Sequence, residues 1–103
     1  MFPIEEFQKR FFAVLDSLDA LFALQTGELQ ERMDEMNAEL EDALMMLDEI
    51  DMRDEDAKEQ LDGTLEEIED LADEYLALAP RVKDLEALAG RLKMIAKMAR
   101  ENL

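Results

Sequence analysis

Residues 47–61, LDEIDMRDEDAKEQL, decide between two possible folds. An apolar heptad, with core positions spaced alternately by three and four residues, runs up to this stretch and continues after it. Its core positions are Met33, Met36, Leu40, Ala43, Leu47 and Ile50, then Leu61, Thr64, Ile68, Leu71, Tyr75 and Leu78. This spacing is typical of helices that pack at coiled-coil angles. Between the two halves, Asp54 and Ala57 hold the core positions but supply little apolar surface.

A break in this stretch predicts an all-α, antiparallel bundle of four helices of similar length, near residues 4–24, 28–50, 54–78 and 81–102. Asp51 or Asp54 would then cap a new helix with an acidic first turn. The unbroken heptad phase, and the absence of Gly and Pro from residues 51–57, favour an alternative. In it, one central helix of about 75 Å covers residues 28–78. The chain would then have three helices, with the first and last short helices packed on the long one. Such a chain would form a coiled-coil-like dimer, because the two short helices leave much of the apolar surface of the long helix in water. We favour the four-helix bundle.

The first and last helices are marked by proline, glycine and apolar stripes. Pro3 and the acidic residues after it favour a helix start, and Gly27 suits the left-handed position after the helix end. Pro80 ends the third helix and opens the fourth. The two stripes are Ile4, Phe7, Phe11, Val14, Leu15, Leu18, Leu21 and Phe22, and then Val82, Leu85, Leu88, Ala89, Leu92, Ile95, Ala96 and Ala99.

Composition limits the chemistry available to the chain. Its 103 residues, with 28 Asp plus Glu, 11 Lys plus Arg and a net charge of −17, predict one acidic domain over residues 1–103. Without Cys or His, it lacks the usual ligands of zinc, haem and iron–sulfur centres. Ser17 is the only serine and the chain has no histidine, so a Ser–His–Asp triad of the hydrolase type cannot form. The acidic residues 51–56 lack the glycine and final glutamate of a calcium loop. We therefore expect no enzyme activity, no cofactor and no metal site.

The most apolar stretch, residues 11–24, does not have the pattern of a transmembrane helix or of a secretory signal peptide. Asp16 and Asp19 interrupt it, it is too short to cross a bilayer, and no small-residue cleavage site follows it. A cytoplasmic protein is the expectation.

Negative charge is concentrated in the middle of the chain. Residues 28–79 carry −18, whereas residues 80–103 carry +3. Glu66, Glu67, Glu69 and Asp70 form a run with no Lys or Arg four residues on, an arrangement that destabilises a helix through like-charge pairs. Such a run is easier to understand if a basic partner neutralises it. The plainer interpretation is a solvated polar face that keeps the protein soluble.

Methionines mark a second set of candidate contacts. Met45 and Met46 fall on the flank and back of the second helix. On the back of the last helix, Ala87, Arg91, Met94 and Met98 form a second stripe. Methionine suits adaptable binding surfaces, although scattered exposed apolar residues are also normal.

These features predict a non-enzymatic protein–protein interaction module, an adaptor, chaperone or inhibitor that holds a helical or basic protein partner and forms a homodimer. One alternative is an acidic mimic of nucleic acid that inhibits a DNA- or RNA-binding protein. Another is a structural homo-oligomer. We expect no direct binding to nucleic acid or membranes, because the chain's charge repels phosphates and anionic lipids.

Overall fold

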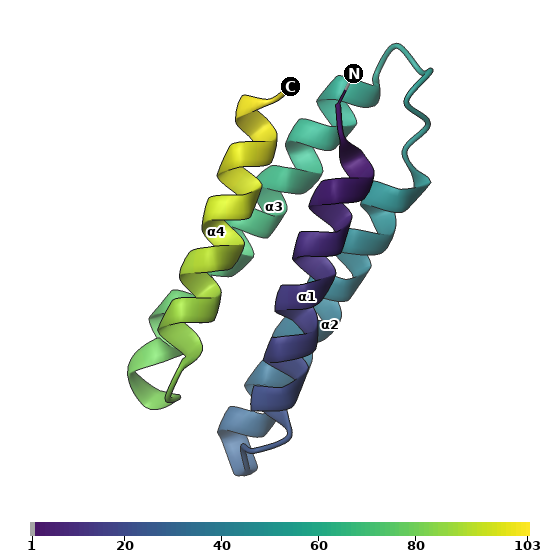
Figure 1. The fold of residues 1–103 in the computed structure, drawn as a ribbon. Helices are drawn as coiled ribbons and strands as arrows, with labels where there is room; N and C mark the ends of the chain where they lie inside the picture. The colour runs from purple at the N-terminus through teal and green to yellow at the C-terminus, as the bar shows by residue number, and fades with distance from the viewer. Residues whose placement is uncertain (1) are drawn as a thin grey trace.

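Residues 2–103, which the computed structural model describes, form four α-helices and a short 3₁₀ turn (Figure 1). The helices are α1 (Ile4–Phe22), α2 (Gly27–Glu49), α3 (Ala57–Leu78) and α4 (Leu85–Glu101), and η1 (Ala79–Arg81) lies between the last two. Each helix runs antiparallel to the preceding one, and α1 also packs against α4. The order around the bundle is therefore α1, α2, α3, α4. The predicted antiparallel four-helix bundle is confirmed, and the long-helix alternative is wrong.

Aspartate side chains support the backbone turns between α2 and α3. Ile50 leaves the helical conformation, with φ −70° and ψ 123°. The Asp51 carboxylate then accepts the backbone N–H of Arg53 at 3.0 Å, and that of Asp54 accepts the N–H of Asp56 at 3.3 Å. Such turns offer the backbone an alternative to helical hydrogen bonds. Asp54 thus lies exposed in the loop, where it supports the turn before α3, while Asp56 takes the N-cap position.

The apolar core follows the predicted stripes closely. Every heptad position within α2 and α3 is buried, and Ile50, the residue after α2, is partly buried. In α4, Ala89, Ala96 and Ala99 are fully buried. These small residues let α4 approach α3 closely, and the two helices share the most extensive contact of any pair.

The last helix begins later than the sequence predicts. Pro80 lies in η1 instead of opening α4, and α4 starts at Leu85. Val82 is extended, and Asp84 takes the left-handed conformation with φ 71°. Aspartate tolerates this conformation better than most residues, so the chain reverses here before the helix begins. Gly27 also has the predicted positive φ, 61°.

A chain of hydrogen bonds, buried at Tyr75 and Asn37 and reaching the surface at Asp19, connects three of the helices. The Tyr75 hydroxyl on α3 donates to Asn37 Oδ1 on α2 at 2.5 Å, and Asn37 Nδ2 donates to Asp19 Oδ1 on α1 at 3.0 Å. Within residues 2–103, every buried side-chain nitrogen and oxygen has a hydrogen-bond partner. Because an unpaired polar group in a core is costly, these bonds favour one alignment of α2 against α3.

Tyr75 provides a test of the buried end of this chain. Burial raises the pKa of its phenol, and the nearby carboxylates Asp19, Glu39 and Glu74 raise it further. The unfolded chain releases this proton near pH 10, whereas the folded protein retains it. The free energy of unfolding should therefore fall as the pH rises above about 10. Since the chain has one tyrosine, the ultraviolet band of the phenolate reports Tyr75 alone.

The expected result is phenolate absorbance that rises only as the fold is lost. Tyr75→Phe should lack the tyrosine part of the alkaline destabilisation in the same chemical denaturation series. A Tyr75 that titrates near pH 10 in the folded protein would contradict the buried hydrogen-bond chain.

Candidate protein-binding groove

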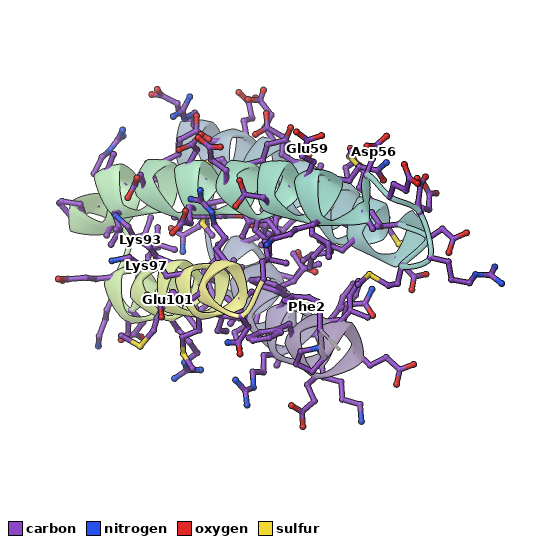
Figure 2. The ribbon with its side chains drawn as sticks, turned by 90° about the horizontal axis from the view of Figure 1, so that it is seen from above. Phe2, Asp56, Glu59, Lys93, Lys97 and Glu101 are labelled. Atoms are coloured by element: carbon purple, nitrogen blue, oxygen red, sulfur yellow. The ribbon has the colours of Figure 1, made fainter. Side chains whose placement is uncertain are left out.

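Charge is distributed unevenly around the bundle. With nine carboxylates and one arginine, α2 carries −8, and with eight carboxylates and one lysine, α3 carries −7. In contrast, α1 carries −2 and α4 carries +2. Figure 2 shows Asp56 and Glu59 projecting from the α3 side, and Lys93 and Lys97 on α4. Because α2 and α3 are neighbours, most of the negative charge lies on one side of the protein.

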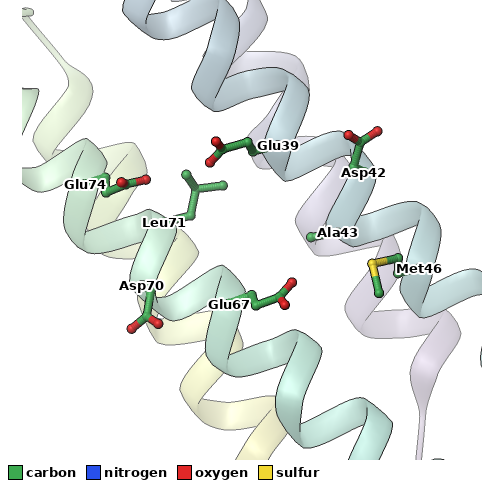
Figure 3. Close-up of a pocket in the computed structure, with 8 residues that line it drawn as sticks. All are labelled: Glu39, Asp42, Ala43, Met46, Glu67, Asp70, Leu71 and Glu74. Atoms are coloured by element: carbon green, nitrogen blue, oxygen red, sulfur yellow. The ribbon is translucent and has the colours of Figure 1, made fainter.

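A groove follows the line where α2 and α3 meet (Figure 3). Its first half has a volume of about 400 Å³. The apolar residues that line this half are Ala43, Met46 and Leu71, which we call its floor. In Figure 3, Glu39 and Glu67 point into the space between the helices. This half is lined by Glu39, Asp42, Ala43, Met46, Glu67, Asp70, Leu71 and Glu74.

A second hollow extends the groove toward the α2–α3 loop. It shares Met46 and Glu67 with the first half, so the two are continuous. On α3 the groove reaches over residues 59–74, a length of roughly 22 Å at the helical rise. The second half is lined by Met46, Glu49, Ile50, Glu59, Gln60, Gly63, Thr64 and Glu67.

The groove contains carboxylates and no cation. Of residues 2–103, no lysine or arginine lines either half, and none of the groove carboxylates forms an ion pair or a hydrogen bond within that part of the chain. The groove carboxylates are Glu39, Asp42, Glu49, Glu59, Glu67, Asp70 and Glu74. The result is a strip of unneutralised negative charge beside an apolar floor.

The carboxylates on the other side of α3 are in a different situation. Lys93 of α4 binds Asp73 at 2.7 Å, and Arg100 binds Asp62 at 2.9 Å and also Glu69. The hydrogen bond to Asp73 raises the pKa of Lys93, and those to Asp62 and Glu69 raise the pKa of Arg100. The positive charge of α4 therefore neutralises the α3–α4 side and leaves the groove unpaired.

The structure divides the predicted acidic run. Glu67 and Asp70 line the groove, and Glu66 is exposed on α3 without lining it. Glu69 is held by Arg100 at the α3–α4 contact, so it is not a free contact for a partner in the groove.

The predicted apolar contacts also separate. Met46 lies in the groove, whereas Met45 lines a different hollow between α1 and α2, together with Phe12 and residues of both charges. The last group, Ala87, Arg91, Met94 and Met98, is exposed on α4 as predicted, with Met94 at 64% exposure.

The sequence interpretation missed most of the groove. Glu39, Asp42, Met46 and Glu49 repeat at spacings of three, four and three, one position before the core heptad of α2. Gln60, Gly63, Glu67, Asp70 and Glu74 do the same in α3. On both helices, the positions directly before the core heptad are mostly polar and repeat in register with it. This repeat was the sequence signal from which the groove could have been predicted.

The groove combines charged and apolar side chains in one place. Carboxylates attract cations, and the methionine, alanine and leucine of the floor add apolar contact area. Over residues 2–103, no three carboxylates gather in a way that would hold a metal ion, and no helix is long and apolar enough to cross a membrane. No family model, curated protein or solved structure matches the chain. Its geometry and charge therefore carry the functional argument.

Like-charge repulsion across the groove should be measurable in the free protein. The double substitution Glu67→Gln with Asp70→Asn removes two groove charges, and we expect it to raise the thermal midpoint at low salt. Each relieved pair contributes about 0.2–0.5 kcal/mol. The gain should shrink as salt is added, since the screening length falls from about 30 Å at 0.01 M to about 3 Å at 1 M.

The matched control is Asp34→Asn with Glu41→Gln, two exposed carboxylates of α2 that do not line the groove. It changes the net charge equally and should stabilise the protein less. Equal gains from the two pairs would show that only the total charge matters.

Proposed function

We propose that this chain is a non-enzymatic binding protein that holds a basic segment of another protein in the α2–α3 groove. The observation that carries the proposal is the strip of unpaired carboxylates along an apolar floor. Lysine and arginine side chains of a partner would neutralise the walls, and their long stems or neighbouring apolar residues would cover Met46 and Leu71. Such capture suits an adaptor, a chaperone or an inhibitor.

Charge also governs how fast such a partner arrives. A protein with a net charge of −17 attracts basic partners over distances comparable to the screening length. The on-rate should therefore fall steeply with salt, while contacts on the apolar floor keep part of the affinity.

A second candidate is mimicry of nucleic acid, which the adjacency of α2 and α3 favours. Together they carry −15 over helices about 34 Å long, or one charge per roughly 2.3 Å. Duplex DNA carries one charge per about 1.7 Å. A mimic would use the carboxylates across both helices and would have little use for the apolar floor.

A homodimer remains a separate proposal. The long-helix reason for expecting one no longer applies, because the bundle covers its own core. The surface available to a second copy is the exposed face of α4 with Ala87, Met94 and Met98. Light scattering on the purified protein should then give twice the chain mass of 11.9 kDa, and a monomer at all concentrations would remove this proposal.

The groove is tested by affinity capture with three variants of the tagged chain. We expect a basic protein captured at low salt to be lost from Glu67→Gln with Asp70→Asn, which removes two groove charges. The same protein should be retained by Asp34→Asn with Glu41→Gln, and by Met94→Glu with Met98→Glu on α4. Retention is then compared after a wash at about half-molar salt, where the screening length is only a few Å.

Capture that survives groove neutralisation would overturn the proposal. Loss confined to the Met94→Glu and Met98→Glu variant would assign binding to α4 instead. If the captured proteins are released by competing duplex DNA, and their capture is unaffected by Met46→Gln in the groove floor, the mimic replaces the groove-binding account.

A further inference from the structure

Gly63 occupies a position where nothing inside the chain requires glycine. It lies in the interior of α3 with its backbone on the ordinary, negative-φ side. A Cβ built on it would meet nothing within 4 Å, so close packing within the bundle does not require it either. Glycine is a poor helix former compared with alanine or glutamine. The residue therefore weakens α3 without any benefit to the fold itself.

The position of Gly63 in the groove suggests what it is for. It lines the half of the groove nearest the α2–α3 loop, one helical turn from both Glu59 and Glu67 and across from Met46 and Ile50. Because glycine has no side chain, the α3 side of the groove is lower at this point. Glycine is the residue used where another backbone must approach closely.

We propose, on the basis of the function proposed above, that the groove holds a cationic amphipathic α-helix whose backbone comes closest at Gly63. The length of the groove fits this occupant, since roughly 22 Å corresponds to about 15 helical residues. The arrangement of charge fits it too. Glu67, Asp70 and Glu74 are spaced by three and four along α3, so a helix lying alongside would place a lysine or arginine near this wall on every turn.

The floor supplies the remaining element of helix recognition. A helix with cations on both flanks has an apolar stripe between them, and this stripe would rest on Ala43, Met46 and Leu71. An extended chain presents a side chain to one face about every 6.6 Å, whereas carboxylates spaced by three and four along α3 recur about every 5.2 Å, close to the ~5.4 Å turn of a partner helix. The charge and the floor together thus favour a helix over an extended basic segment.

Gly90 is a natural control for Gly63. It is also an exposed glycine in the interior of a helix, and a Cβ built there would likewise meet nothing within 4 Å. It belongs to α4 and does not line the groove. Substitution at either position should raise the thermal midpoint, because both remove a poor helix former from the interior of a helix.

The test measures binding of two synthetic 15-residue peptides made of lysine, leucine and alanine. One has a single leucine–alanine stripe flanked by lysines when helical, and the other is a scrambled version with the same charge and no stripe. Gly63→Gln should lower the affinity for the striped peptide by about tenfold or more, because the new side chain occupies the space where the peptide backbone comes closest. Gly63→Ala should lower this affinity less. Gly90→Gln and Gly90→Ala should bind like the parent chain, and all four variants should melt at or above the parent midpoint.

The outcomes separate this inference from the function on which it rests. If the Gly63 and Gly90 variants bind the striped peptide with equal affinity, the claim that the bound helix comes closest at Gly63 is overturned. The groove function would still stand if Glu67→Gln with Asp70→Asn weakened both peptides. Equal binding of the striped and scrambled peptides would overturn the helical occupant, and failure of both peptides to bind the parent chain would overturn the inference and the function together.

Discussion

Electrostatic repulsion between α2 and α3 is the constraint that the rest of the structure must overcome. Two helices of −8 and −7 lie side by side, and their buried apolar residues and the Tyr75–Asn37 hydrogen bond hold them together. The fold relieves part of this repulsion from one direction. Through Lys93 and Arg100, α4 binds the carboxylates on its own side of α3. On the groove side, no lysine or arginine of residues 2–103 pairs with the carboxylates.

This arrangement connects stability to binding. A cationic ligand in the groove would supply the counter-charge that α4 provides elsewhere, and it would stabilise the folded state by mass action because the unfolded chain lacks the groove. The exposed glycine of α3 adds to the same picture. In a chain whose middle helices already repel each other, Gly63 is a further local cost, and its placement between two groove carboxylates associates that cost with the surface that we propose to be functional.

The sequence predicted the core well because burial follows local periodicity. Each heptad position from Met33 to Leu47 could be assigned from spacing alone, and so could the exposure of Met94 and Met98. The α2–α3 break was harder to predict, since the turns at Asp51 and Asp54 interrupt a heptad whose phase is the same on both sides of them. Side chains of one acidic run serve different surfaces, with Glu67 in the groove and Glu69 bound to Arg100. That division depends on which helices are neighbours and how each is rotated, information that a single helix pattern does not contain.

We propose that the α2–α3 groove, and not the methionine face of α4, is the binding surface. Backbone amide chemical shifts, followed by nuclear magnetic resonance while the striped lysine peptide is added, test it most directly. The account predicts that the shifted amides follow the groove, over residues 39–50 of α2 and 59–74 of α3, with α4 little changed. Shifts centred on Ala87, Met94 and Met98, with the groove amides unmoved, would contradict it.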